Sequence, residues 1–264
     1  MAEVDRQAGD ASVCDHLVQV YRKQLELAEA VAVFFSAGLS AGDAVVSVAT
    51  PTHSAAIAAR LEKRGFDLER LRAEERFVTA DAAATLAAVS EDGAPSPARF
   101  RSVVGELIGR AAGSTTGYIR VFGEMVDILC RRGERAAADT LEAYWNQLRR
   151  ERRFELLCAY KLDLFDRDVQ VNLLPQVYRA HSDVLPLAEV DALDEAVEHA
   201  LVEVLGAEDA QKVRAQVERH LRDERVSEGQ RILMWVSAHM PRVAEKVLDA
   251  ARDGYLDAVE TAAA

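Results

Sequence analysis

The residues best placed to do chemistry lie in the segment Thr50-Pro51-Thr52-His53-Ser54, directly after the apolar stretch AVVSVA. That stretch is typical of a buried parallel strand, and the residues after the segment have the spacing of a helix. In nucleotide-binding folds such a turn is rich in glycine and ends in Lys followed by Ser or Thr, which hold phosphates. The segment contains neither glycine nor lysine. It therefore favours sensing over hydrolysis.

Two side chains at this edge of the predicted sheet are candidates for contact with a small ligand. His53 begins the predicted helix, where a neutral imidazole can donate or accept a hydrogen bond; the alternative is an ordinary surface residue of a first turn. Glu124 follows a predicted strand, so its carboxyl group can project over the same edge; alternatively it only complements the helix dipole. With Thr50 and Thr52 they form the polar part of the predicted ligand site.

Four further residues complete the predicted ligand site. Tyr21 and Tyr160 are expected as walls, and Asn146 as a polar contact at the end of an aromatic stripe. His16 lies beside Cys14, which raises the question of a metal site. Metal sites usually need three or four ligands, and the sequence has no CxxC or HxxxH spacing to supply the others. We therefore expect no metal, and we expect His16 to pack against the sheet edge or to form a hydrogen bond there.

The sequence offers no good candidate for catalysis. Ser54 is adjacent to His53, and adjacent helical residues do not face one another. There is no G-x-S-x-G motif. Cys158 lies in an apolar strand, where thiols are usually inert. We expect a protein that is not an enzyme, and the sequence does not identify a cofactor.

The elements that must position these residues alternate between strand and helix. Helices are predicted over residues 23–37, 54–64, 81–90, 97–111 and 134–153, and strands over residues 45–48, 76–80, 118–123 and 154–160. The first helix is expected to end at Gly38. Such alternation predicts an α/β fold with a doubly wound, mainly parallel sheet. Ligands of such sheets bind outside the carboxyl ends of the strands, where Thr50, His53, Glu124 and Tyr160 are expected.

The residues from Asn172 onward have a helical pattern only. Helices are predicted near residues 173–181, 189–205, 207–224, 227–239 and 242–258. We expect a sensory α/β domain at residues 1–170 and a helical module for output or assembly at residues 171–264. Trp235 and Met240 are suited to an interface, and a homodimer is slightly favoured over packing within one chain.

Composition limits the partners and the compartment. The net charge is −12, so the chain lacks the positive field that nucleic-acid backbones require. No apolar run approaches the length of a membrane span, and the N-terminus lacks the order of a signal peptide. The three cysteines are far apart, which fits reduced thiols. We expect a cytoplasmic protein without direct nucleic-acid or membrane binding.

Several segments together resemble the MEDS domain, the methanogen and methylotroph sensory domain. In the family's order they are DHLVQVY (15–21), FSAGL (35–39) with Gly42-Asp43, ATPTH (49–53), FGEM (122–125), LEAYWN (141–146) and LCAY (157–160). The resemblance covers residues 14–165 and extends to Ser182 if YRAHS is included. It implies a degenerate RecA/KaiC-like fold and a role in prokaryotic signalling and transcriptional regulation, with small hydrocarbon derivatives as proposed ligands. Residues 183–264 resemble neither a DNA-binding domain nor a histidine kinase.

Taken together, the sequence favours a sensory protein that binds a small molecule at the carboxyl edge of the sheet and signals to a protein partner. The first alternative is a nucleotide-binding RecA-like switch, or a weak ATPase with a non-standard P-loop. The second alternative is a protein-interaction module with a vestigial pocket. The sequence identifies neither the ligand nor the partner.

Overall fold

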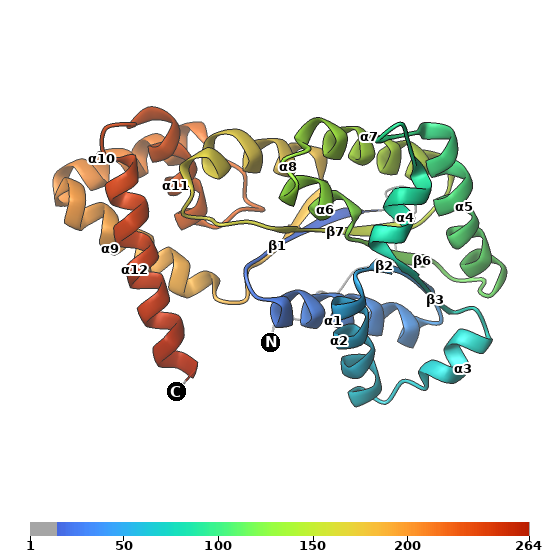
Figure 1. Cartoon of the computed structure of the whole chain (residues 1–264). Helices are drawn as coiled ribbons and strands as arrows, with labels where there is room; N and C mark the ends of the chain where they lie inside the picture. Colours follow the sequence, from blue (N-terminus) through green and yellow to red (C-terminus); the bar gives the residue numbers. More distant parts are fainter. Residues whose placement is uncertain (1–14, 264) are drawn as a thin grey trace.

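The core of the molecule is a six-stranded parallel sheet with strand order β3-β2-β6-β7-β1-β8 (Figure 1). The computed structural model describes residues 15–263, so Cys14 lies outside the described residues. The strands are β1 (His16–Tyr21), β2 (Ala44–Ala49), β3 (Phe77–Asp81), β6 (Ile119–Gly123), β7 (Glu155–Lys161) and β8 (Asp183–Leu185), with a separate hairpin of β4 (Ser90–Glu91) and β5 (Ala94–Pro95).

Helices cover both faces of this sheet. They are α1 (Gln24–Ala41), α2 (Pro51–Lys63), α3 (Leu68–Ala73), α4 (Ala82–Val89), α5 (Pro97–Gly113), α6 (Met125–Arg131), α7 (Arg135–Glu151), the π-helix η1 (Val169–Leu173), α8 (Leu174–Ala180), α9 (Val190–Leu205), α10 (Ala207–His220), α11 (Glu228–His239) and α12 (Ala244–Ala263). The predicted α/β fold with a parallel sheet and a helical C-terminal region is confirmed.

The two faces of the sheet carry separate apolar layers. On one face α1, α2 and α3 pack on side chains such as Val45 and Phe122. On the other face α4 to α8 pack on side chains such as Val46 and Val121. Because successive strand residues point to opposite faces, strands covered on both sides must be apolar throughout. Figure 1 shows the sheet between these two layers of helices.

The order of the strands decides which loops meet at the carboxyl edge. From β2 the chain crosses to β3 at one side and then returns past β2 to β6, with helices on opposite faces. β2 and β6 are therefore neighbours, although 69 residues lie between Ala49 at the end of β2 and Ile119 at the start of β6. The turns that follow β2 and β6 lie side by side, which places Thr50 near Glu124.

The end of α1 differs from the prediction. The helix continues through Gly38 to Ala41, and Gly42 ends it with φ 90°. Gly38 instead serves close packing, since a Cβ there would lie 2.5 Å from Cδ of Arg120. A glycine without a left-handed backbone was therefore misread as a helix terminator.

Two strands of the six-stranded sheet were missed by the sequence analysis, as was the separate hairpin of β4 and β5. β1 lies inside the sheet between β7 and β8, and its segment HLVQVY carries no turn signal to mark where it begins. β8 has only three residues and lies in the part expected to be all helical. The sheet thus extends beyond residue 170, where the first domain was predicted to end.

The C-terminal helices pack at the β8 side of the sheet, and α9 makes its most extensive contacts with α12 (Figure 1). Buried side chains such as Leu193, Leu233 and Leu248 belong to the same apolar cluster as Val18 and Leu156 of the sheet. One apolar core is therefore shared by the sheet and these helices.

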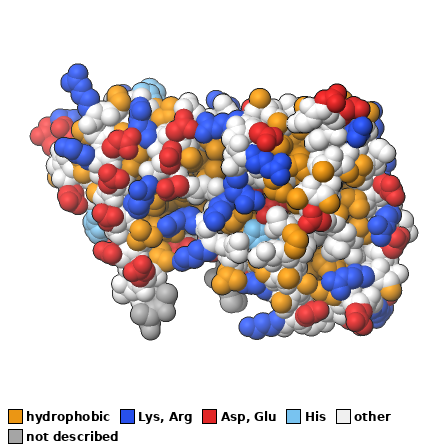
Figure 2. All heavy atoms as spheres, viewed as in Figure 1, with side chains coloured by type: hydrophobic (Ala, Val, Ile, Leu, Met, Phe, Trp, Pro, Cys, Tyr) orange, Lys and Arg blue, Asp and Glu red, His pale blue; other side chains and the backbone are white. Residues whose placement is uncertain are grey.

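Among residues 15–263, one helix, α1, is long and apolar enough to cross a membrane by length and composition, with a mean hydropathy of 1.2. Leu27, Val31 and Phe35 of this helix are fully buried against the sheet. Packing as a core helix accounts for its composition. On the visible face of the molecule, Lys and Arg side chains are interspersed with Asp and Glu side chains (Figure 2).

Candidate functional site

The carboxyl edge holds a buried group of polar side chains centred on Glu124. This residue follows β6, and its carboxyl Oε2 accepts a hydrogen bond from the backbone N–H of Thr50, at 2.7 Å. Its own backbone N–H donates to the carbonyl of Val48 in β2, at 3.0 Å. Glu124 is fully buried. It therefore joins the turn after β6 to the turn after β2.

His53 lies in the first turn of α2, which begins with Pro51. Its Nδ1 lies 2.6 Å from Glu124 Oε1 and 3.3 Å from the hydroxyl of Thr50. Because carboxylate oxygens accept hydrogen bonds, Nδ1 carries the hydrogen, and in the neutral imidazole Nε2 then has the lone pair. The Nε2 atom is buried and has no hydrogen-bond partner. Glu124 therefore orients a histidine whose second nitrogen is buried without a partner.

Tyr21 and Asp127 extend this group toward β7. The ring of Tyr21 meets the ring of His53 edge-on, with centroids 5.8 Å apart. Its hydroxyl donates to Asp127 Oδ2 at 3.2 Å, and Asp127 Oδ1 accepts from the backbone N–H of Lys161 at 2.8 Å. Burial raises the pKa of Tyr21 and the pKa of Asp127. We call Tyr21, Thr50, His53, Glu124 and Asp127 the edge cluster.

The structure brings four of the predicted ligand residues into the edge cluster. These are Tyr21, Thr50, His53 and Glu124. Thr52 is exposed on the first turn of α2, outside these contacts. Asp127 was not predicted, although its position three residues after Glu124 on a helix is the spacing that places two side chains on one face.

The other three predicted residues belong to a second group on the face of the sheet that α7 and α8 cover. His16 begins β1, and its Nδ1 lies 3.1 Å from Asn146 Oδ1 of α7. Its Nε2 lies 3.4 Å from Sγ of Cys158 and 3.4 Å from Oε2 of Glu142. The hydroxyl of Tyr160 donates to Glu142 Oε1 at 2.5 Å. Tyr160 therefore does not contribute a wall to the edge cluster.

His181, the residue after α8, completes this second group. Its Nδ1 lies 2.7 Å from the carbonyl of Val177, and its Nε2 lies 3.6 Å from Glu142 Oε1. The rings of His16 and His181 lie 4.1 Å apart between centroids. We call this group the face cluster. Its members are His16, Glu142, Asn146, Cys158, Tyr160 and His181.

Burial controls the charge of the face cluster. It lowers the pKa of His16 to about 2, helped by electrostatic interactions with His181 and with the guanidinium of Arg149. It also raises the pKa of the Cys158 thiol and of the Tyr160 hydroxyl. Without a bound cation, His16, Cys158 and Tyr160 are neutral near pH 7. Sequence reasoning missed Glu142 and His181 as members, because no short spacing connects them to His16.

A cavity of about 220 Å³ lies between the sheet and the C-terminal helices. It is lined by Val20, Leu164, Tyr178, Val184, Leu185, Pro186, Leu187, Val190, Glu224, Arg225, Val226, Ser227 and Gln230, and we call it the junction cavity. Most of these side chains are apolar. Gln230 donates through Nε2 to Gln170 at 2.8 Å, and its buried Oε1 has no hydrogen-bond partner. Small-molecule sites commonly combine apolar walls with a few polar atoms.

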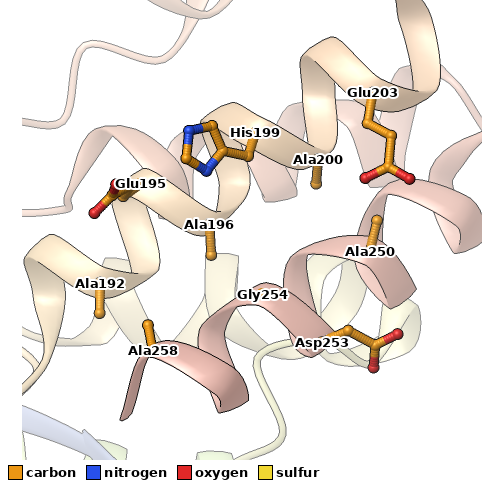
Figure 3. A pocket seen from close by; sticks show the side chains of 10 residues that line it. All are labelled: Ala192, Glu195, Ala196, His199, Ala200, Glu203, Ala250, Asp253, Gly254 and Ala258. Carbon is orange, nitrogen blue, oxygen red and sulfur yellow. The ribbon is translucent and has the colours of Figure 1, made fainter. Parts of the chain in front are cut away.

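A second hollow lies between α9 and α12 and measures about 550 Å³ (Figure 3). Small residues such as Ala196 and Gly254 form its floor, and charged residues such as Glu203 and Asp253 lie around it. The small side chains let the two helices approach closely. A Cβ added at Gly254 would lie 3.5 Å from the Cβ of Ala196.

Comparison with known proteins places the chain in a family. The model of the MEDS family, described as the methanogen/methylotroph, DcmR sensory domain, matches residues 15–181. No curated protein and no solved structure matches the chain. The relation to RecA/KaiC-like folds stays a prediction. The matched range contains every residue of both clusters and covers well over half of the chain, so the chain belongs to the MEDS family of sensory domains.

Proposed function

We propose that this protein senses a small, mainly apolar molecule with one hydrogen-bond donor, bound in the junction cavity. The observation that carries the proposal is the unpartnered Oε1 of Gln230 beside an apolar cavity. An apolar cavity of about 150 Å³ can accept benzene, so a cavity of about 220 Å³ suits a molecule of that size or slightly larger. A donor on the ligand would satisfy Gln230.

The position of the cavity supports a role in signalling. Val20 and Leu185 belong to strands of the sheet, whereas Val190 and Gln230 belong to α9 and α11. A ligand that contacts both parts stabilises the arrangement in which they are packed together. The C-terminal helices would then pass this change to a signalling protein or to a second copy of the chain, in the cytoplasm.

Binding without turnover fits the geometry of the edge cluster. The hydroxyl of Thr50 lies at Nδ1 of His53, where Glu124 also binds, and not at Nε2. A general base acts on a nucleophile through its free nitrogen, so this arrangement does not activate Thr50. The turn also lacks the lysine and glycines of a phosphate site, which makes a nucleotide switch the weaker alternative.

A pair of isomers tests the proposal in the full chain. Benzyl alcohol has a hydroxyl donor, and anisole has the same atoms without a donor. We expect benzyl alcohol to bind about 3–10-fold more tightly by titration calorimetry, because a neutral hydrogen bond contributes about 0.5–1.5 kcal/mol. Val184→Phe should fill the cavity and abolish binding of both. Binding should also slow amide hydrogen exchange in α11.

A second location for the ligand is the edge cluster, favoured by the unpartnered Nε2 of His53. His53→Gln separates the two locations. If the junction cavity holds the ligand, H53Q binds benzyl alcohol as the wild type does, and Val184→Phe does not. The reverse result would place the ligand at the edge cluster. If the wild type binds neither benzyl alcohol nor anisole, the result would favour a vestigial pocket.

A further inference from the structure

We propose that the face cluster is a binding site for a divalent transition-metal ion of the zinc class, with His16, Glu142, Cys158 and His181 as its ligands. Each of these residues offers one ligand atom, and the four atoms lie within 4.8 Å of one another. All four side chains are buried. The site revises the expectation, drawn from sequence spacing, that the chain binds no metal.

The distances suit a tetrahedral ion. Zinc bonds of about 2.0–2.3 Å at tetrahedral angles separate neighbouring ligand atoms by about 3.3–3.6 Å. Nε2 of His16 lies 3.4 Å from Sγ of Cys158 and 3.4 Å from a carboxyl oxygen of Glu142. Nε2 of His181 lies 3.6 Å from the other carboxyl oxygen, and Sγ of Cys158 lies 4.0 Å from Glu142. The widest pair of ligand atoms, at up to 4.8 Å, must close by roughly 1 Å when an ion binds.

The hydrogen bonds of the two histidines point their lone pairs into the cluster. Nδ1 of His16 faces Asn146 Oδ1, and Nδ1 of His181 faces the carbonyl of Val177. Both partners are acceptors, so each Nδ1 carries the hydrogen, and in the neutral imidazole each Nε2 then has the lone pair. Metal-binding histidines are held in this way, with the second nitrogen donating to a carbonyl or carboxyl oxygen.

A cation resolves a shortage of donors in the cluster. Two imidazole lone pairs and a carboxyl group converge there, and the hydroxyl of Tyr160 already donates to Glu142. Only the thiol of Cys158 remains as a donor among the four ligands. Nε2 of His181 is buried and has no hydrogen-bond partner. A hydrogen-bonded network without metal leaves this atom unsatisfied, whereas a metal ion satisfies it.

The ligand set favours zinc and a role in holding the domain together. Two nitrogens, one sulfur and one oxygen in a closed tetrahedron are typical of zinc, and four protein ligands leave no open position for a substrate. The ligands come from β1, α7, β7 and the end of α8. His16 and His181 also lie at the two ends of the family match. The ion would therefore link the first and last segments of the sensory domain.

Metal content of the full chain tests the site. We expect purified protein, or metal-free protein reconstituted with zinc, to hold about one zinc per chain by elemental analysis. With Co²⁺ instead, we expect the visible bands of a tetrahedral site and a thiolate-to-cobalt charge-transfer band in the near ultraviolet. Absence of both the stoichiometric zinc and the charge-transfer band in the wild type would overturn the proposal.

Variants identify the ligands. Cys158→Ser should remove the charge-transfer band, and His181→Gln should release zinc to a chromophoric chelator. Asn146→Ala should keep one zinc but weaken its affinity about 10–100-fold, since it removes only the partner that orients His16. Cys130→Ser and His199→Gln, which replace a cysteine and a histidine outside the cluster, should leave the content and the spectrum unchanged.

Two of the measurements do not require that a variant lacking a metal ligand folds. The cobalt spectrum of the wild type requires no substitution, and Asn146 is a partly buried residue whose replacement removes no ligand. A charge-transfer band that survives in a folded Cys158→Ser protein would place the metal elsewhere and overturn the assignment. Loss of the band with Cys130→Ser would do the same.

Discussion

The edge cluster and the face cluster are each built around a buried glutamate and a histidine, but the two glutamates have different partners. Glu124 accepts from a backbone N–H, a hydroxyl and one histidine, so protein donors satisfy its oxygens. Glu142 faces two histidines and a thiol, and Tyr160 is its one strong donor. The edge cluster is thus arranged as a hydrogen-bonded link, and the face cluster as a set of converging ligands.

The positions of the clusters in the sheet explain this difference. The edge cluster lies where β2 and β6 end, and the free N–H groups at the start of α2 supply donors for a carboxyl group. The face cluster lies along the lengths of β1 and β7, where the backbone groups pair with neighbouring strands. Only side chains are available there, and most of them accept. The same pair of residue types therefore acts differently in the two places.

The largest expected effect is the loss of stability when zinc is removed. This loss should depend on the face cluster and not on the edge cluster. Zinc should raise the free energy of unfolding by about 4 kcal/mol when free zinc is 1,000 times its Kd, because it binds the folded chain. Urea unfolding at fixed free zinc, with and without chelator, measures the difference. Glu124→Gln should show the same zinc increment, since distant sites are additive. Equal curves with and without zinc would contradict the distinction.

The second effect concerns Glu124 as a link between two turns. Glu124→Ala leaves the N–H of Thr50 and Nδ1 of His53 buried without an acceptor, and each orphaned group costs about 1–3 kcal/mol. We expect a total loss of about 2–4 kcal/mol in urea unfolding, and a smaller loss for Glu124→Gln. Glu134→Ala is the control, because this exposed N-cap residue of α7 makes no side-chain capping hydrogen bond and should change stability by less than about 0.5 kcal/mol.

The third effect concerns the bond that connects the edge cluster to β7. Tyr21→Phe removes one hydrogen bond to Asp127, which keeps the N–H of Lys161 and the guanidinium of Arg131. We expect a loss of about 1 kcal/mol in the free energy of unfolding. Tyr118→Phe, at an exposed tyrosine, should lie within about 0.5 kcal/mol of the wild type. A loss as large as that of Glu124→Ala would mean that Tyr21 also positions His53.

The sequence predicted the edge cluster better than the face cluster for a topological reason. The ends of strands are visible as a change from apolar residues to a helix start, and parallel strands bring such ends together. Thr50, His53 and Glu124 could therefore be grouped before their contacts were known. Gly38 shows the limit of the same method, because its packing against Arg120 depends on a neighbouring strand.

The face cluster could not be predicted because its members lie far apart and within elements. Cys158 follows His16 by 142 residues, and only the pairing of β1 with β7 brings the two together. Cys158 was read as an inert thiol from its apolar neighbours, which describes its burial correctly but not its contacts. His181 lies after a short helix whose position depends on packing. The number of converging acceptors is a property of the folded chain.

The smallest expected effect is a pH dependence that belongs to the edge cluster alone. Burial raises the pKa of Asp127 above its ordinary value of 3.8, so the folded chain holds this proton more tightly than the unfolded chain. The stability of the wild type relative to Asp127→Asn should therefore fall as pH rises above about 4 and level off beyond the raised pKa.

Asp223 provides the control with the opposite sign. Hydrogen bonds from Arg225 lower the pKa of Asp223, so its contribution is present above pH 4 and is lost as pH falls through the lowered pKa. Urea unfolding of Asp127→Asn and Asp223→Asn between pH 3 and 7 measures both slopes. Because the unfolded reference is the same for two aspartates, opposite slopes can come only from the folded surroundings of each carboxyl group. Two slopes of the same sign would show that Tyr21, Lys161 and Arg131 together stabilise a charged Asp127 more than burial opposes it.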